Sequence, residues 1–456
     1  MNRESVNKSN LKFQNLKIAG KSSLSGQINI SGAKNSALVL LAASLLTEEE
    51  VFIDNIPNLT DIQKMKNILK TLGVKIFKEN NNLVINSKDL KVCELPYKLV
   101  NSLRASFFCI GALLARNGEA SLALPGGCKI GKRPIHEHIK GLRALGAKIH
   151  IKNGFVNAKV DNKCKRLIGS NISLECPSVG ATETLIMAAT LAEGETIINN
   201  AAREPEIQDL CQMLNKMGAK INGAGESTII ICGVERLNGC SHKVIPDRIE
   251  AGTFLIAAAA TLSSITISPV IPQHLESVLT KLRESGSDLI IKKDSITIKT
   301  NYIKSTDIET APFPGFPTDL QAPFTSLMAI ADGDSKITET IFENRMSHIS
   351  LLNEMGASIE TKNNVAFVKG VKELNGAKLL GLDLRSTAAI VIAALAANSQ
   401  SKIGGLEHLD RGYDNFESKL NILGANIIRE SSNDFFLESK IIMKNSICNS
   451  KDFQAA

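Results

Sequence analysis

The stretch LGAKI at residues 145–149 decides the fold, because close copies of it recur along the chain. The common pattern is an apolar residue, a glycine, a small residue, a polar residue and an apolar residue. Successive copies lie 68 to 73 residues apart, with their glycines at Gly73, Gly146, Gly218, Gly286, Gly356 and Gly424. Six copies at a near-constant spacing indicate an internal repeat, which has to be weighed before any single motif.

The residues around each copy follow one order. An amphipathic run precedes the glycine, and in the third copy its apolar residues follow the spacing of one helix face: Leu210, Met213, Leu214 and Met217. We expect the glycine to take the left-handed conformation that closes a helix. Two short strand-like runs then follow, joined by a turn such as KNG at residues 152–154.

An Ala-rich run and a further strand complete each repeat. These runs are apolar nearly all round, as a helix buried between sheets must be. They read NSALVLLAASLL, RASFFCIGALLA, ATETLIMAATLA, RIEAGTFLIAAAA, TDLQAPFTSLMAIA and LRSTAAIVIAALAA. The sequence therefore predicts an α/β fold of six βαβαββ units.

Composition narrows the class of protein. The 456 residues, 43% of them hydrophobic, are enough for roughly two or three domains. The net charge of +7 is mild and suits anionic small molecules, and the lack of Trp argues against base stacking and hence against a nucleic-acid partner. No apolar run reaches the roughly 18 residues of a membrane span, and the N-terminus has no apolar core of a signal peptide. Nine scattered cysteines without a CxxC pair favour a reducing compartment, so we expect a cytoplasmic protein.

Charged residues recur at two positions of the repeat. The first is the start of the Ala-rich helix, with Lys34, Asn35, Arg104, Thr182, Glu183, Asp247, Arg248, Asp319 and Arg385. The second is the loop before the amphipathic helix, with Cys128, Arg133, Arg203, Glu204, Glu206, Glu343, Arg345 and Arg411; its copies NIPNLT and PVIPQH carry less charge. Helix N-termini that face one another with these cations would bind phosphate or carboxylate. The alternative is that the charges form only a solvated rim.

The loop LPGGCKIGKRP at residues 124–134 combines a thiol, flexible glycines and cations. A free thiol has a pKa of about 8.5, and neighbouring cations lower it. Cys128 therefore has the surroundings of a proton donor or nucleophile, whereas a lone cysteine is more often an inert buried residue.

Ten stretches together resemble the EPSP synthase-like enolpyruvyl transferases, in particular those that act on UDP-N-acetylglucosamine. The resemblance runs from about residue 13 to about residue 430. The stretches are SGAKNSAL (31–38), SLRASFF (102–108), LPGGCKIGKRP, PSVGATET (177–184), NAAREPEI (200–207), PDRIEAGTF (246–254), FPTDLQAPF (316–324), ETIFENRMSH (339–348), LDLRS (382–386) and DRGYDNFESKL (410–420).

This resemblance implies a fold and a reaction. The fold is an inside-out α/β barrel of two similar domains with three units each: residues 34–245, which carry the cysteine loop, and residues 246–456 together with residues 1–33. The reaction moves the enolpyruvyl group of phosphoenolpyruvate to the 3-hydroxyl of UDP-N-acetylglucosamine and releases phosphate. It is the first committed step of peptidoglycan precursor synthesis, and so of cell-wall biogenesis, cell shape and division. It implies no cofactor and no metal, the two small molecules as substrates, and neither nucleic acid nor membrane as a partner; it does not indicate whether the enzyme has protein partners.

The resemblance also implies residue roles. Cys128 is the expected acid, which also forms a covalent adduct with phosphoenolpyruvate, and Asp319 is the expected base. The phosphoenolpyruvate contacts would be Lys34, Asn35, Arg133, Arg385 and Arg411, of which Lys34 and Arg411 would also be catalytic. The nucleotide-sugar contacts would be Arg104, Arg133, Pro134, Ile135, His136, Glu137, Ser178, Val179, Asp319 and Ile341, and supporting residues would be Glu204, Glu206, Asp247, Arg345 and Asp383.

One position departs from the family pattern. His136 stands where the family usually has an acidic or amide residue, and His138 follows two positions later. Two close histidines without a third ligand are usually ordinary surface residues, so we expect no metal there. Two alternative functions remain: a 3-phosphoshikimate enolpyruvyl transferase and a non-catalytic nucleotide-sugar-binding protein.

Overall fold

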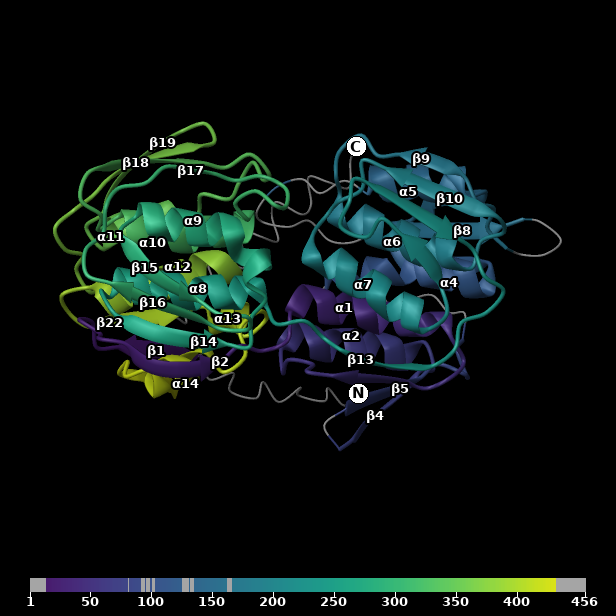
Figure 1. Cartoon of the computed structure of the whole chain (residues 1–456), viewed down its shortest axis with the longest axis horizontal. Helices are drawn as coiled ribbons and strands as arrows, with labels where there is room; N and C mark the ends of the chain where they lie inside the picture. The colour runs from purple at the N-terminus through teal and green to yellow at the C-terminus, as the bar shows by residue number, and fades with distance from the viewer. Residues whose placement is uncertain are drawn as a thin grey trace, which may run out of the picture.

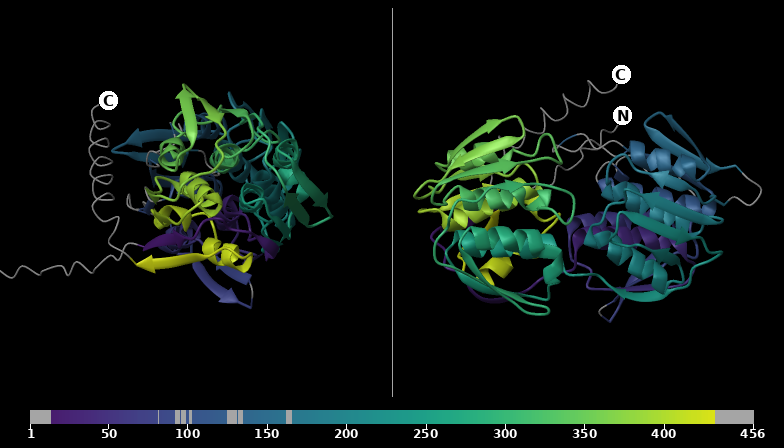
Figure 2. Two further views of the ribbon diagram at one scale, coloured as in Figure 1. Left: turned by 90° about the vertical axis from the view of Figure 1, so that its left-hand side faces the viewer. Right: turned by 45° about the horizontal axis from the view of Figure 1, so that its top comes forward.

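The computed structural model describes residues 14–80, 82–91, 95, 99–100, 103–124, 131, 135–161 and 166–431. These residues form two lobes that lie side by side (Figure 1), as the tilted view on the right of Figure 2 also shows. The core of the first lobe runs from Ala33 to Val244. The core of the second lobe combines Leu16–Ile30 with Ile249–Ile427. The first strands of the chain therefore pack with residues 249–427.

Three small sheets surround the first lobe. In hydrogen-bonding order they are β13 (Cys240–Lys243), β3 (Val51–Asp54), β5 (Asn82–Asn86) and β4 (Lys75–Glu79); β6 (Glu119–Ala123), β8 (Phe155–Val160) and β7 (Ala147–Lys152); and β11 (Lys220–Asn222), β12 (Thr228–Cys232), β10 (Glu195–Asn199) and β9 (Asn171–Ser173). Leu95 adds a parallel bridge to Leu122 beside β6.

Three further sheets surround the second lobe. Their orders are β15 (Ser287–Ile291), β16 (Ile296–Thr300), β14 (Ser264–Ser268) and β2 (Ser25–Asn29); β17 (Ile308–Glu309), β18 (Asp334–Thr338), β20 (Val365–Lys369) and β19 (Ser358–Lys362); and β21 (Lys378–Leu380), β22 (Ser401–Gly404), β1 (Gln14–Ile18) and β23 (Ile427–Ser431). In each four-stranded sheet of the two lobes one end strand pairs in parallel with its neighbour, and the remaining pairs are antiparallel.

The Ala-rich runs form buried helices inside this ring of strands, because they are apolar on every face. They are α1 (Lys34–Ala43), α4 (Cys109–Asn117) and α6 (Val179–Thr190) in the first lobe, and α8 (Arg248–Ala260), α10 (Thr318–Met328) and α12 (Leu384–Ala396) in the second. Within the second lobe all three pack against one another. The run at residues 104–115 differs from the prediction of one helix, because it starts with a 3₁₀ helix, η2 (Arg104–Phe108), a frequent form of a helix N-terminus.

The amphipathic runs form helices with one buried face: α2 (Thr60–Thr71), α5 (His136–Ala144), α7 (Pro205–Lys216), α9 (Glu276–Glu284), α11 (His348–Glu354) and α14 (Phe416–Ile422). Three short elements complete the described set: η1 (Ser44–Leu46), η3 (Pro272–Leu275) and α13 (Leu406–Leu409). The glycine after each amphipathic helix has φ between +88° and +106°, which confirms the predicted helix-closing role at all six copies.

Two chain crossings connect the lobes, and they lie side by side. Ala33 donates its backbone N–H to the Ile245 carbonyl at 2.7 Å, and Asp247 donates to the Ser31 carbonyl at 2.8 Å. Between them Gly32 forms an antiparallel bridge with Pro246. A Cβ on Gly32 would stand 1.8 Å from the Asn55 carbonyl oxygen, so this close approach requires glycine. The paired crossings lead directly into the starts of α1 and α8, which places both helix N-termini at the junction of the lobes.

Candidate functional site

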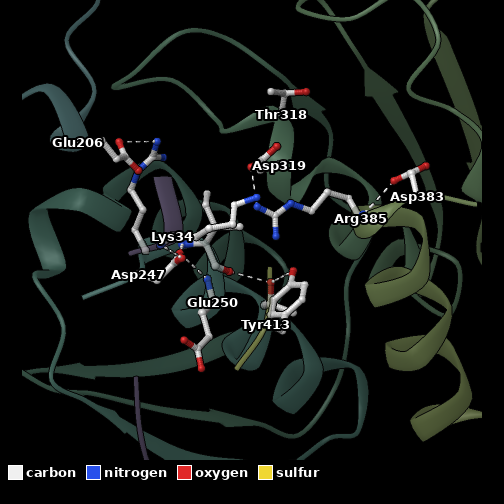
Figure 3. A network of polar contacts seen from close by, with 12 residues as sticks. Lys34, Glu206, Asp247, Glu250, Thr318, Asp319, Asp383, Arg385 and Tyr413 are labelled. Carbon is white, nitrogen blue, oxygen red and sulfur yellow. Dashed lines mark hydrogen bonds and ion pairs between the residues drawn. The ribbon is translucent and has the colours of Figure 1, made fainter. Parts of the chain in front are cut away.

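Asp319 lies in the first turn of α10 and is shared by two arginines, of which Arg385 is labelled beside it in Figure 3. Its Oδ1 accepts a hydrogen bond from Arg345 at 2.5 Å, and its Oδ2 accepts one from Arg385 at 2.6 Å. Both arginine side chains are 6% exposed, and that of Asp319 is 24% exposed. Burial alone would raise the pKa of Asp319, but the guanidinium groups of Arg385 and Arg345 outweigh it and hold this pKa well below its usual range. The carboxylate is therefore ionised.

Aromatic rings and hydroxyls hold the two arginines in place. The Arg385 guanidinium lies 5.3 Å from the centre of the Tyr413 ring, and the Tyr413 hydroxyl is 2.9 Å from that of Thr253. Arg345 also donates to the Thr318 hydroxyl at 3.0 Å. Such contacts restrict the rotamers of long side chains, so this pair of cations is preorganised.

A second buried carboxylate, Asp61, joins cations from the two lobes. It lies in the first turn of α2 with a side chain only 3% exposed. Arg411, from the loop between α13 and α14, donates to it through Nε at 2.8 Å and Nη2 at 3.4 Å. The Lys34 ammonium lies 3.8 Å from the same carboxylate. Burial lowers the pKa of Lys34, and the charge of Asp61 opposes that shift.

Sequence analysis did not find Asp61. It follows the loop NIPNLT, which carries little charge, and an acidic residue in a first helical turn is ordinarily explained by the helix dipole. Its arginine partner is 350 residues away in the chain. A signal was present in the sequence all the same, because this aspartate falls at the same point of the repeat as the predicted charged loops.

Asp247 ties the starts of two buried helices together. Its Oδ1 caps α8 by accepting from the backbone N–H groups of Ile249 at 2.8 Å and Glu250 at 3.0 Å. Its Oδ2 accepts from the backbone N–H of Lys34, the first residue of α1, at 3.1 Å. Asn35 follows as an exposed second residue. Asp247, which was predicted to be a supporting residue, therefore contacts the first turn of α1 directly.

The remaining supporting acids also lie at helix starts. Glu206 in α7 forms a buried pair with Arg248 at 3.1 Å, which joins the two lobes. Glu204, the residue before α7, accepts from the backbone N–H of Phe313 at 3.4 Å, and burial raises the pKa of Glu204. Asp383 caps α12 through the backbone N–H groups of residues 385 and 386 and accepts from the Ser347 hydroxyl. Burial opposes these bonds, which together lower the pKa of Asp383.

The residues predicted for the nucleotide sugar lie mainly at helix starts of the first lobe. Arg104 begins η2, Ile135 precedes α5, His136 and Glu137 begin α5, Ser178 caps α6, and Val179 begins it. Ile341 lies in the second lobe and is 36% exposed. Cys128, Arg133 and Pro134 lie outside the described residues. Gly131 is described, and a Cβ there would stand 3.3 Å from the Glu343 nitrogen, so Gly131 itself lies beside the second lobe.

The expectation that both histidines are surface residues is wrong for His138. Its side chain is buried at 7% exposure, with Nδ1 3.0 Å from the Thr184 hydroxyl and the ring edge against Phe107. Burial lowers the pKa of His138 to about 3, so it is neutral. His136 is exposed and, with Glu137 and Glu175, could hold a metal ion by spacing alone. Lys140 donates to Glu175 at 2.8 Å, and its positive charge disfavours a cation there.

Comparisons with known proteins place this chain in a family. The family model described as EPSP synthase (3-phosphoshikimate 1-carboxyvinyltransferase) matches residues 18–420. A protein of Prochlorococcus marinus (strain AS9601) with the name UDP-N-acetylglucosamine 1-carboxyvinyltransferase is 67% identical over 435 residues, which cover 95% of both chains. One of the same name from strain MIT 9301 is 68% identical over 93% of both.

Solved structures show the same fold at low sequence identity. The enolpyruvyl transferase NikO from Streptomyces tendae has a TM-score of 0.83 at 24% identity, with 92% of this chain and all of that chain covered. An EPSP synthase from Acinetobacter baumannii has a TM-score of 0.72 at 19% identity, with 91% of this chain and all of that chain covered. The chain thus belongs to the EPSP synthase family of enolpyruvyl transferases, beside members that carry the name UDP-N-acetylglucosamine 1-carboxyvinyltransferase.

Proposed function

We propose that the chain transfers the enolpyruvyl group of phosphoenolpyruvate to the 3-hydroxyl of UDP-N-acetylglucosamine and releases phosphate. The observation that carries this proposal is the meeting of four cations at the junction of the lobes. Arg345 and Arg385 share Asp319, and Lys34 and Arg411 share Asp61. Phosphoenolpyruvate carries a phosphate and a carboxylate, and cations at helix starts suit both groups. The relatives at 67% and 68% identity support the choice of acceptor.

The two lobes supply different parts of the proposed site. Phosphoenolpyruvate lies between Lys34 and Asn35 of the first lobe and Arg385 and Arg411 of the second, with Arg133 from the cysteine loop. The nucleotide sugar extends over the first lobe toward Ile341 of the second, along the contacts Arg104, Pro134, Ile135, His136, Glu137, Ser178 and Val179. Glu204, Glu206, Asp247, Arg345 and Asp383 hold these elements in register.

The proposed chemistry is addition followed by elimination. The 3-hydroxyl oxygen bonds to C2 of phosphoenolpyruvate as Asp319 takes the hydroxyl proton, and Cys128 gives a proton to C3. Loss of a proton from C3 and departure of phosphate from C2 then restore the double bond. A carboxylate that accepts from two guanidinium groups is a weak base. Asp319 therefore gains basicity when the substrate's anionic groups draw Arg385 toward themselves.

The proposal extends to the domains of the chain, its cellular compartment and its metabolic step. The two cores represent domains of residues 34–245 and of residues 246–456 with 1–33, each an inside-out barrel of three βαβαββ units. The shared pairing order of the sheets supports this assignment. Among the described residues no helix combines the length and apolar character that crossing a membrane requires. We assign the enzyme to the cytoplasm, at the first committed step of peptidoglycan precursor synthesis.

Phosphate release by the purified protein tests the proposal. Release from phosphoenolpyruvate that depends on UDP-N-acetylglucosamine is expected, with none when shikimate 3-phosphate replaces it. The reverse dependence would identify a 3-phosphoshikimate enolpyruvyl transferase. Calorimetric binding of the nucleotide sugar without any release would identify a non-catalytic binding protein.

A further inference from the structure

The start of α1 carries Lys34 and Asn35, yet its own sequence does not fix it. The residue before the helix is Ala33, which has no side chain that can cap. The direction of Lys34 and Asn35 therefore depends on contacts from other elements. One of these is Asp247, which accepts from the Lys34 backbone N–H. Apolar packing against α2, α4 and α7 also restrains α1. Apolar contacts are non-directional, however, so they fix the rotation of the helix less sharply than a hydrogen bond on its side.

A second contact comes from Asp209 in α7, a residue outside the proposed chemistry. The Ser36 hydroxyl in α1 donates to Oδ2 of Asp209, and the His242 ring in β13 lies 2.8 Å from its Oδ1. Ser36, Asp209 and His242 are 0%, 1% and 4% exposed, so no solvent competes for these bonds. Figure 1 shows α1, α7 and β13 in one part of the first lobe, and α7 contacts both other elements.

The neighbours of His242 show which of its ring nitrogens donates to Asp209. Lys216 lies 3.2 Å from Nδ1 of His242, and an ammonium group only donates. Nδ1 is therefore the acceptor, and Nε2 carries the hydrogen that it donates to Asp209. The backbone N–H of Ile245 also points to Asp209 at 3.4 Å, and the Ile245 carbonyl accepts from Ala33. One buried carboxylate thus connects α1, β13 and both lobe crossings.

We propose that Asp209, acting through Ser36, is a positioning residue that fixes the rotation of α1 and so aims Lys34 and Asn35 at phosphoenolpyruvate. This inference rests on the proposed function. Successive residues of an α-helix are about 100° apart around the axis, so a bond at Ser36 sets the direction of the two residues before it. Asp247 holds the helix end and Asp209 holds its side, and the two carboxylates together take the place of a cap.

Ser36→Ala tests the inference, since it removes one hydroxyl and leaves Asp209 bonded to His242. The matched control is Ser44→Ala, because Ser44 is also buried and donates one bond, to the Leu41 carbonyl at 2.7 Å, beyond the other end of α1. The KM for each substrate and kcat come from phosphate release, phosphoenolpyruvate affinity from calorimetry, and stability from the urea midpoint.

Ser36→Ala should weaken phosphoenolpyruvate on the order of 10-fold in KM and in direct affinity, because small misplacements of a binding group are costly. The KM for the nucleotide sugar should stay within about twofold, and the urea midpoint should shift as much as in Ser44→Ala, whose kinetic constants should match those of the wild type. For the phosphoenolpyruvate KM, Asp209→Asn should add little to the Ser36→Ala effect in the double variant, since Asp209 reaches α1 through the Ser36 bond. Its bonds to His242 and Ile245 affect stability and are followed by the urea midpoint.

Three outcomes would overturn the inference. One is an unchanged phosphoenolpyruvate KM in Ser36→Ala, and another is a parallel rise for both substrates, which would indicate a general structural loss. The third is full additivity in the double variant. A wild-type protein that binds phosphoenolpyruvate without releasing phosphate would overturn the proposed function alone, because calorimetry still measures the effect of Ser36. A wild-type protein that fails to bind it would overturn both.

Discussion

Replacing Asp319 by asparagine takes away the negative charge that Arg345 and Arg385 share at 2.5 and 2.6 Å. Two unit charges about 4 Å apart attract by about 4 kcal/mol at an effective dielectric constant of about 20. An incoming phosphate has to compete with that attraction. Asp319 is partly accessible, and the anion loses hydration when it binds. We therefore expect only about a third of this energy to contribute to phosphate affinity when the carboxylate is removed. About 1.4 kcal/mol corresponds to a tenfold tighter dissociation constant for phosphate in Asp319→Asn.

The same substitution leaves two buried cations without their partner. Breaking a buried ion pair costs about 3–5 kcal/mol, and the partial exposure of Asp319 favours the lower end. For a domain of this size about 3 kcal/mol lowers Tm by roughly 6–12 °C. Added phosphate should restore part of this loss, because a ligand that binds only the folded state stabilises it.

Three measurements on Asp319→Asn check this reasoning: phosphate affinity by calorimetry, Tm with and without phosphate, and turnover by phosphate release. Turnover should fall strongly while the nucleotide sugar still binds. Glu417→Gln is the matched control, since Glu417 pairs with a partly buried Arg429 at 2.6 Å, and it should leave phosphate affinity unchanged. Weaker phosphate binding in Asp319→Asn would refute the competition, and near-normal turnover would remove Asp319 from the mechanism.

Three more outcomes are expected. Burial raises the pKa of Glu250 from 4.5 to about 7, so the unfolded chain releases this proton at lower pH than the folded protein, and stability falls as pH rises from 4.5 to about 7. In Glu250→Gln the urea midpoint should depend less on pH across this window, and an unchanged dependence would contradict the assignment. A small phosphonate-bearing epoxide should alkylate Cys128 but neither Cys109 nor Cys211, whose pKa values burial raises to about 12, as peptide mass mapping would show, and Cys128→Asp should resist it. Saturating ligands should compact the molecule in small-angle scattering, and less so in Arg411→Ala. This substitution should weaken the binding of phosphoenolpyruvate more than it weakens the binding of the nucleotide sugar. Identical scattering curves with and without ligands would count against closure of the lobes.

The repeated elements could be predicted from the sequence because each has a local cause. Glycine is the residue that adopts positive φ after a helix without strain, and an Ala-rich run has no polar face to expose. The recurring charges likewise pointed to Asp319 and Arg385 at helix starts and to Arg345 in the loop before an amphipathic helix. It could not show that the expected base is held by two guanidinium groups, because that pairing depends on distances between helices that are far apart in the chain.

The buried carboxylates Asp61 and Asp209 escaped prediction for a different reason. Each lies on an amphipathic helix, where an acidic residue is expected to face water. Both turn inward because their partners come from other elements: Arg411 for the first, Ser36 and His242 for the second. The periodicity of a single sequence shows which helix face is apolar. It cannot show that an acidic residue is buried because a residue far away in the chain pairs with it.

The pairing of β1 with β22 and β23 has a consequence for synthesis on the ribosome. The chain emerges from its N-terminus, so Gln14–Ile18 leaves the exit tunnel long before its partners at residues 401–404 and 427–431 have been made. The core of the first lobe is complete once Val244 has emerged, whereas the second lobe cannot close its last sheet before residues 427–431 have emerged. During that interval β1 is an unpaired strand with apolar residues, which is the kind of segment that holdase chaperones cover. A messenger RNA truncated before codon 427 would therefore yield one folded lobe and a tethered, incomplete one.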